Sequence, residues 1–433
     1  MRFLTIVILM NVLSHGLLAT WLFTFFPRAR RYKRRIALVV VALAVMPWIA
    51  RFENRRNSSR PLVVLHAIGM TEQMVVVFGA LPMAAFMGAR ALGRLAARRL
   101  RDRRTAHGGR TADAQRTDSG QRTPDSGQQT ADSGQQTADS GQQTADSGRR
   151  TADGGQRMEA GALSRRDAVT RLGGALSWGM TAPLLGWGLV RGRHGFVVEE
   201  VVVRLPKLPR TLDGYTIVQV SDVHAGTFVD DRELAEGLAL AAGVRPDLLV
   251  VTGDLVDFDA AYMEVFLRRL GALSARDGKL FILGNHDYYA GANHVVGHLQ
   301  RAGQDLLMNA SRVVRPGDKG GIAILGVDDL WAKPDLDRAL TGVPEDTPRI
   351  LLAHQPLFFD WAVGRVDLQL SGHTHGGQVN PGFRPADYLM KYVSGRYERN
   401  GSVLWVNRGF GVAAVPARIG APPEITKIVL VAT

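Results

Sequence analysis

The order of apolar and polar residues divides the chain into four regions. Long apolar runs dominate residues 1–104, a polar segment of low complexity covers residues 105–163, and a moderately apolar stretch lies within residues 164–192. From residue 197 to residue 433 short apolar runs alternate with polar segments. Long apolar runs are typical of membrane helices, and short β-branched runs are typical of buried strands. We therefore expect a membrane region, a linker, a further membrane segment and a folded C-terminal domain.

Three apolar segments in the first region, residues 3–26, 36–50 and 61–89, predict about three transmembrane helices. A buried core helix is the alternative for each segment, most of all for the short second one. Six Lys or Arg residues lie between Arg28 and Arg35, and seven Arg lie between Arg90 and Arg104. Because positive residues are enriched in cytoplasmic loops, these clusters place the N-terminus outside and residue 90 inside.

A fourth apolar segment, residues 172–190, decides the side of the membrane on which the C-terminal domain lies. If it crosses, the protein is a multi-pass protein of a bacterial cytoplasmic membrane with an extracytoplasmic C-terminal domain. The paired Arg165 and Arg166 precede this segment. They fit either a twin-arginine translocation signal, which would make that export machinery a partner, or an ordinary pair of cytoplasmic anchoring arginines. Ala168 stands where such a signal usually has a large apolar residue.

The segment 105–163 contains a seven-residue repeat, TADSGQQ, which starts at Thr130 and Thr137 and recurs in variant form around them. No position of the repeat carries a large apolar residue, so a coiled-coil seam cannot form. The segment also buries too little apolar surface to offset its ordering entropy. We interpret it as a flexible linker.

Charge is unevenly distributed along the chain, whose formal net charge is +13. Of the 53 Lys and Arg residues, 24 lie from Phe196 onward, where 28 of the 40 acidic residues also lie. This part is therefore slightly acidic, which argues against nucleic-acid binding, and the positive charge of the N-terminal part fits membrane topology. The absence of cysteine excludes disulfides and thiolate metal sites.

The C-terminal domain is predicted to have an α/β fold. Two amphipathic helices are expected at residues 231–242 and 261–270. The apolar runs predict strands at residues 216–220, 248–251, 280–283, 322–325, 350–353, 368–370, 403–406 and 425–431. In α/β domains ligands gather beyond the carboxyl ends of strands.

Five short motifs fall where apolar runs end. They are DVH at 222–224, GDLVD at 253–257, GNHD at 284–287, the histidine of AHQP at 354, and HTH at 373–375. Together they supply carboxylates, an amide oxygen and imidazoles, a set that suits borderline divalent metals. Taken singly, His354 could be a structural histidine, and Asp254 and Asp257 could be helix N-caps. Five motifs in this order predict a two-metal hydrolytic site, with Asp254 as the candidate bridge between the metals.

These motifs resemble those of the calcineurin-like metallophosphoesterase superfamily over residues 212–431. The later segments LWVNRGFG and PPEITKIVL resemble its bacterial membrane-associated, YkuE-type branch. The resemblance implies a four-layer α/β/β/α sandwich at residues 197–433, preceded by the transmembrane helices and the disordered linker. Gln355 follows His354 where that branch often has Asn, which puts the substrate in doubt and not the reaction.

The resemblance also implies a role for each motif residue. One metal would be held by Asp222, His224, Asp254 and His375, and the other by Asp254, Asn285, His354 and His373. His286 would contact the scissile phosphate and be oriented by Asp257. A hydroxide bridging the two metals would attack phosphorus, and His286 would donate a proton to the leaving oxygen. Mn, Fe, Zn and Co all accept this ligand set.

We expect a membrane-tethered phosphoesterase that acts on a phosphodiester, a lipid-linked phosphate or a pyrophosphate. A soluble nucleotide is an alternative substrate. The competing functions are a catalytically silent metal-binding scaffold and a sensor module attached to the membrane domain. Tyr288, Tyr289 and Trp331 either lie near the site and shape its specificity or serve as packing residues.

Overall fold

The computed structural model describes residues 2–54, 165–226, 228–315 and 321–433, together with scattered positions between 76 and 99. The predicted linker at residues 105–163 lies outside the described residues. So does most of the third apolar segment, residues 61–89.

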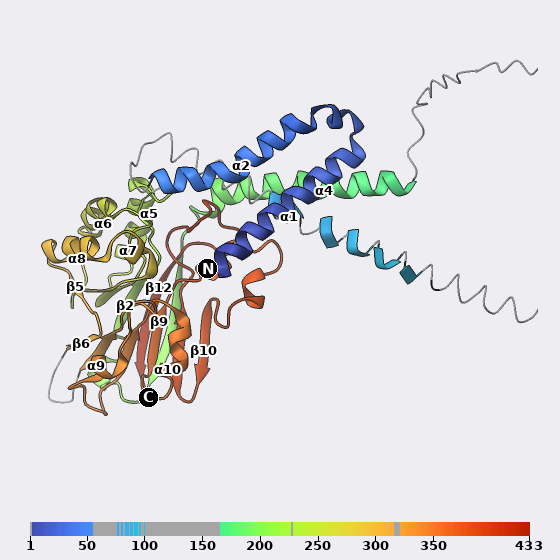
Figure 1. The fold of residues 1–433 in the computed structure, drawn as a ribbon. Helices are drawn as coiled ribbons and strands as arrows, with labels where there is room; N and C mark the ends of the chain where they lie inside the picture. The colour runs from blue at the N-terminus through green and yellow to red at the C-terminus, as the bar shows by residue number, and fades with distance from the viewer. Residues whose placement is uncertain are drawn as a thin grey trace, which may run out of the picture. The chain divides into compact units, whose positions relative to one another are not determined.

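Three long helices contain the other apolar segments. They are α1 (Arg2–Phe25), α2 (Lys33–Asn54), which follows the 3-10 turn η1 (Pro27–Tyr32), and α4 (Arg165–Trp187), which continues into the π-helical turn η2 (Gly188–Gly192) (Figure 1). Within the part of the chain that the structure describes, no helix combines the length and apolar character that crossing a bilayer requires. The predicted membrane spans are therefore unconfirmed.

The first sheet has six strands in the order β1-β12-β2-β3-β4-β5. β12 is antiparallel to β2, whereas the other neighbouring strands are parallel. The strands are β1 (Val197–Leu205), β2 (Thr216–Val220), β3 (Leu248–Thr252), β4 (Lys279–Ile282), β5 (Asp305–Leu306) and β12 (Glu424–Ala432).

The second sheet also has six strands, in the order β10-β11-β9-β8-β7-β6. Its central strands are parallel, and the two edge strands β10 and β6 pair antiparallel with their neighbours. The strands are β6 (Ala310–Val314), β7 (Ile322–Gly326), β8 (Arg349–Leu352), β9 (Leu368–Ser371), β10 (Gly395–Arg399) and β11 (Ser402–Val406).

Alternating side chains of the strands build a core on each face of the first sheet. Ile217 and Leu248 pack against residues of the second sheet, such as Ile324, in the core between the sheets. Their neighbours Val218 and Leu249 belong to the core on the opposite face. Because successive side chains of a strand point to opposite faces, one apolar strand supports both cores.

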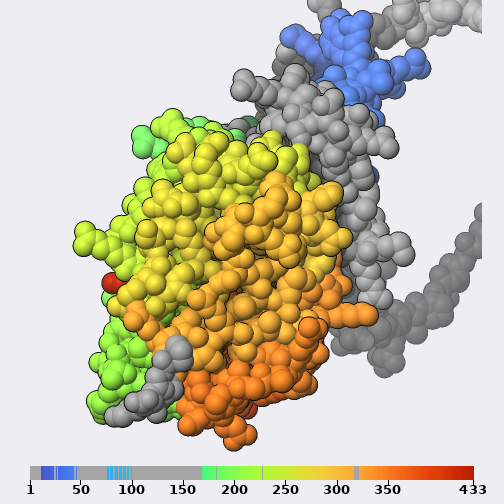
Figure 2. All heavy atoms as spheres, turned by 90° about the vertical axis from the view of Figure 1, so that its left-hand side faces the viewer, coloured from blue at the N-terminus to red at the C-terminus, as the bar shows by residue number. Residues whose placement is uncertain are grey.

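Helices cover the outer face of each sheet. Over the first sheet lie η4 (Ala260–Tyr262) and the helices α5 (Asp231–Gly243), α6 (Met263–Leu270), α7 (Asn285–Tyr289) and α8 (Ala292–Arg301). Over the second sheet lie α9 (Leu336–Leu340), η5 (Pro356–Phe358) and α10 (Phe359–Ala362). The remaining short helices are η3 (Arg210–Leu212), η6 (His375–Gly377) and η7 (Pro385–Tyr388). Figure 2 views the side on which α6 and α8 lie and shows their yellow surface adjoining the orange surface of later segments.

The predicted α/β fold is confirmed, and its sheets are mixed rather than parallel throughout. Every strand that the sequence predicted is present with bounds within one residue. α5 matches its prediction closely because Asp230 caps it and accepts hydrogen bonds from the N–H groups of Arg232 and Glu233. Four strands were not predicted, namely β1, β5, β6 and β10, each of which lies at the edge of a sheet.

Candidate metal centre

The predicted motif residues all follow the carboxyl ends of neighbouring strands. In the first sheet, Asp222 follows β2, Asp254 follows β3 and Asn285 follows β4. In the second sheet, His354 follows β8 and His373 follows β9. Because these strands are parallel neighbours within each sheet, their ends open on the same side. A hydrogen bond from the Gln219 side chain to the carbonyl of Ser371 joins the two sheets beside these ends, at 3.0 Å.

The backbone is left-handed at most of the predicted ligands. Five of them have a positive φ: Asp222 (51°), His224 (48°), Asp254 (53°), His373 (72°) and His375 (51°). This conformation costs about 1–2 kcal/mol for a residue with a side chain, and such strain clusters at functional sites. The backbone is therefore bent so that these side chains turn toward one another.

Six predicted ligands form one chain of close contacts. The Nε2 atoms of His224 and His375 are 3.0 Å apart, and His375 Nε2 lies 3.5 Å from Asp222 Oδ1. The contacts continue from His224 Nε2 to Asp254 Oδ2, at 3.6 Å, and from there to His354 Nε2, at 3.2 Å. His354 Nε2 in turn lies 3.3 Å from His373 Nδ1. Two groups with the spacing of metal ligands result, one of Asp222, His224 and His375 and one of Asp254, His354 and His373.

The seventh predicted ligand, Asn285, is buried beside these groups at the start of α7. Its side-chain oxygen is shielded from solvent and has no hydrogen-bond partner among the residues that the structure describes. A buried amide oxygen without a partner costs free energy, so a cation ligand would relieve it.

The donor set fits divalent metal ions. Facing imidazole nitrogens at 3.0 Å repel through their lone pairs unless a proton or a cation lies between them. His354 Nδ1 lies 2.9 Å from the carbonyl of Thr252 and donates to it, so Nε2, which faces Asp254 at 3.2 Å, is the nitrogen that can bind a metal once it has lost its proton. Such an outer hydrogen bond is typical of metal-binding histidines.

The pKa values of the histidines differ according to their neighbours. Burial, assisted by His354, lowers the pKa of His373 to about 4, and burial with His224 and Arg418 holds the pKa of His375 well below its ordinary value. These two rings are therefore neutral and can ligate a metal. Burial also acts to lower the pKa of His354, but the charge of Asp254 outweighs it and raises this pKa to about 10. His354 must therefore lose a proton when it binds a metal.

His286 and Asp257 form a pair at the side of the candidate ligands. His286 Nδ1 lies 3.0 Å from the backbone carbonyl of Asp257 and 2.9 Å from its Oδ1. The backbone N–H of His286 donates to Asp254 Oδ1 at 2.8 Å. Burial acts to lower the pKa of His286, but Asp254 and Asp257 raise it to about 9, which favours the imidazolium form. His286 also lies within ligand distance of His224 and Asp254, but its side chain is more exposed than either of theirs.

Asp287 holds two of the motif loops together, a role that the sequence did not suggest. It is fully buried, and its carboxylate accepts hydrogen bonds from the N–H groups of Leu255, Val256 and Gly284. Burial and the nearby Asp254 raise its pKa to about 7. The only feature of the sequence that marks Asp287 is its position as the last residue of the GNHD motif.

Arg418 is a second residue that the sequence did not single out. Its side chain is only 1% exposed, and its guanidinium donates to the backbone carbonyls of Arg408, Gly409, Gly411 and Ala421. Its Nη2 lies 3.2 Å from His375 Nδ1, so Arg418 supports the back of that ring. It lies in an irregular loop far along the chain from His375, where no periodic pattern marks a buried position.

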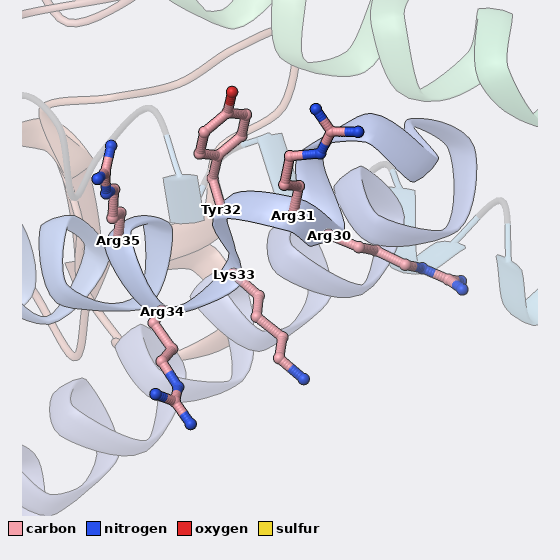
Figure 3. Close-up of a pocket in the computed structure, with 6 residues that line it drawn as sticks. All are labelled: Arg30, Arg31, Tyr32, Lys33, Arg34 and Arg35. Carbon is pink, nitrogen blue, oxygen red and sulfur yellow. The ribbon is translucent and has the colours of Figure 1, made fainter.

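A separate concavity of about 440 Å³ lies at the connection of α1 and α2. It is lined by Arg30, Arg31, Tyr32, Lys33, Arg34 and Arg35. Figure 3 shows these side chains pointing away from one another rather than converging on a common point. This arrangement is a basic surface and not a metal or catalytic site.

Comparison with known proteins gives a match to the family described as calcineurin-like phosphoesterase, over residues 215–377. The uncharacterized metallophosphoesterase YkuE of Bacillus subtilis is 33% identical over 285 residues, which cover 63% of this chain and 99% of that protein. A zebrafish protein, named a transmembrane protein with metallophosphoesterase domain, is 34% identical over 266 residues. That alignment covers 58% of this chain and 61% of the zebrafish protein.

Among solved structures, the chain is similar to TT1561 of Thermus thermophilus, with a TM-score of 0.32 and 14% sequence identity. The similarity covers 46% of this chain and 90% of the TT1561 chain.

Proposed function

The chain belongs to the calcineurin-like metallophosphoesterase family, and from this premise we propose that it is a metal-dependent hydrolase of phosphoesters. The observation that carries the proposal is the continuous series of contacts from Asp222 to His373, which passes through Asp254. A carboxylate in the middle of two histidine-rich groups is suited to being shared by two cations.

We assign the ligands as two sets that share Asp254. One set is Asp222, His224, Asp254 and His375, and the other is Asp254, Asn285, His354 and His373. When bound, two divalent metals supply Lewis acidity toward phosphoryl oxygens and lower the pKa of a water molecule. The mixed oxygen and nitrogen ligands suit Mn, Fe, Zn or Co.

The protein's own contribution to the proton chemistry comes from His286. Its Nδ1 faces both the carbonyl and the carboxylate of Asp257, so Nδ1 carries a hydrogen and donates to that residue. The other ring nitrogen, Nε2, is then the atom that holds the transferable proton. Because Asp254 and Asp257 favour the imidazolium, His286 is suited to protonate the leaving oxygen of a phosphoester. Asp257 acts as a positioning residue that fixes the ring.

We further propose that the enzyme is tethered to a membrane. The zebrafish relative is named a transmembrane protein, and the apolar residues of α1 and α2 flank a cluster of six Lys and Arg residues between Arg28 and Arg35. Such clusters interact with anionic lipid headgroups, at about 1 kcal/mol per cation near the surface. A lipid-linked phosphoester is then an accessible substrate class. We also propose that the catalytic domain lies on the extracytoplasmic face of the membrane.

Hydrolysis of bis(4-nitrophenyl) phosphate by the purified full chain tests the catalytic proposal. We expect turnover that depends on added Mn²⁺, is abolished by a chelator, and is absent in Asp254→Ala. Bound metal without turnover of this ester or of a panel of monoesters and glycolipid phosphates would instead indicate the silent scaffold.

Protease treatment of intact cells tests the proposed membrane topology. We expect the catalytic domain to be cleaved from outside while the chain sediments with the membrane fraction. Protection of the domain in intact cells, with cleavage only after lysis, would overturn the extracytoplasmic location.

A further inference from the structure

Three aromatic side chains extend outward from His286. The ring centroid of His286 lies 5.0 Å from that of Phe258 and 5.2 Å from that of Tyr289. Phe258 and Tyr289 are nearly parallel, with an interplanar angle of 13° and a centroid distance of 6.0 Å. Trp331 continues the row at 5.7 Å from Tyr289. Exposure increases along it, from 39% for Tyr289 to 71% for Trp331.

The loop that carries Trp331 is fixed to the residue after a predicted metal ligand. Asp329 is fully buried, and its Oδ1 accepts a hydrogen bond from the backbone N–H of Trp331 at 2.8 Å. The side-chain amide of Gln355 donates to Asp329 Oδ2 at 2.5 Å, and its oxygen accepts from the N–H of Leu330 at 3.2 Å. Gln355 directly follows His354, so the position of Trp331 is coupled to the metal centre.

The same loop is fixed a second time, through the helix that carries His286. The hydroxyl of Tyr288 donates to Asp328 Oδ1 at 2.5 Å. Tyr288 lies between His286 and Tyr289 in helix α7, so this bond holds Tyr289 and Trp331 on adjacent, anchored segments. Burial and the hydrogen bond to Asp328 raise the pKa of Tyr288 well above its ordinary value, so the hydroxyl stays protonated and can donate.

The ring of Trp331 is exposed and its backbone is anchored, so one face of the ring can stack against a ligand. A scattered apolar side chain on a protein surface needs no explanation, but three aromatic rings in contact beside a catalytic group form a patch. We propose that Phe258, Tyr289 and Trp331 form a stacking subsite for a planar aromatic ring carried by the leaving group of the substrate. This inference rests on the proposed phosphoesterase function and adds a substrate class to it.

The proposed role of His286 determines where the leaving group of the substrate lies in the site. This residue is proposed to protonate the leaving oxygen, so the group bonded to that oxygen departs toward the rings that surround His286. The rings stand at separations typical of aromatic pairs, roughly 4.5–7 Å, and offer π faces. An alkyl chain bound there would be stabilised by burial alone. A planar ring, whether a nucleobase or an aryl group, would be stabilised both by burial and by stacking on the aromatic rings.

Two synthetic phosphodiesters separate aromatic recognition from general apolar contact. Methyl 2-phenylethyl phosphate and methyl 2-cyclohexylethyl phosphate have primary alkoxide leaving groups of similar basicity and differ in the planarity of the ring. The quantities to compare are kcat/KM and the identity of the released alcohol for the full-length wild type, Trp331→Ala, Trp331→Phe and Trp361→Ala. Trp361 is the matched control, because it is 57% exposed and contacts Phe358 on the outer face of the second sheet.

We expect the wild type to release 2-phenylethanol in preference to methanol and to favour the phenyl ester over the cyclohexyl ester. Trp331→Ala should lower kcat/KM for the phenyl ester roughly tenfold, mainly through KM, and leave the cyclohexyl ester little changed. Trp331→Phe should restore much of the loss, and Trp361→Ala should match the wild type. Unchanged metal content and melting temperature in Trp331→Ala verify that its fold is intact.

Three results would overturn the subsite and spare the phosphoesterase function. They are equal rates for the two esters, preferential release of methanol from both, or the same loss for both esters in Trp331→Ala. The last result indicates an apolar contact of the kind an acyl chain would use. If neither these esters nor bis(4-nitrophenyl) phosphate is hydrolysed at any metal loading, the proposed function itself fails.

Discussion

The Nε2 atoms of His224 and His375 lie 3.0 Å apart, although the two residues are separated by 151 positions in the chain. Both side chains are buried, and both residues have a left-handed backbone conformation. The two facing imidazole nitrogens are therefore buried at strained backbone positions. A cation that replaces the proton between them would stabilise the fold.

Metal binding should therefore stabilise the fold. A ligand that binds only the folded state adds about 2.7 kcal/mol at a free concentration one hundred times its Kd. We expect Mn²⁺ to raise the melting temperature of the metal-free wild type and of His294→Ala, in which an exposed histidine of α8 is removed. His375→Ala should show a much smaller increase. Equal increases in all three proteins would contradict the placement of His375 at a metal.

Replacement of His286 by alanine should separate catalysis from metal binding. Loss of a general acid typically costs about 10²–10⁴-fold in rate. We expect turnover of an alkyl phosphodiester to fall within this range, while elemental analysis still finds the wild-type metal content. Asp257→Asn should cause a smaller loss, because it weakens only the positioning of the ring. Unchanged turnover in His286→Ala would remove this residue from the mechanism.

Asp287→Ala should destabilise the domain without touching a proposed ligand. The substitution leaves the N–H groups of Leu255, Val256 and Gly284 without their acceptor. Each unsatisfied buried donor costs about 1–3 kcal/mol, so the free energy of unfolding should fall by at least about 3 kcal/mol. Denaturant unfolding of the metal-free protein measures this loss. Asp346→Ala, at an exposed position, should stay within about 0.5 kcal/mol of the wild type. Similar effects of the two substitutions would show that Asp287 does not hold the loops.

The ion pair between His286 and Asp257 should make the stability of the metal-free protein depend on pH. Its pKa of about 9 in the folded state lies above the ordinary value, so the folded protein binds this proton more tightly than the unfolded chain does. The resulting stabilisation is complete below about pH 6.5 and is lost as the pH rises through about 9. The melting temperature of the wild type should therefore approach that of His286→Gln over this interval. A difference that stays constant from about pH 6 to about pH 10 would contradict the raised pKa.

Strands buried on both faces were predictable because most of their positions are apolar. Val250 packs between the sheets and Val251 packs under the helices, and residues 248–251 of β3 form an unbroken apolar run. Edge strands were missed because one face is partly exposed and the run is broken, as in β10, where Arg396 and Glu398 point outward.

The sequence predicted those site residues that follow strands directly and whose own side chains carry the donor atoms. Asp222 and Asp254 end apolar runs and carry donor atoms, so both could be identified from sequence. Asp287 and Arg418 act through backbone N–H and carbonyl groups of distant loops. Such contacts leave no periodicity or spacing in the sequence, because they depend on how the loops fold back.

Titration of the metal-free protein with Mn²⁺, while hydrolysis of bis(4-nitrophenyl) phosphate is followed, tests the shared metal centre most directly. We expect turnover to increase until two metal ions are bound per chain and then to level off, with Asp254→Ala inactive throughout. Turnover that reaches its maximum at one bound metal, or that never appears with two bound, would contradict a catalytic centre built around Asp254.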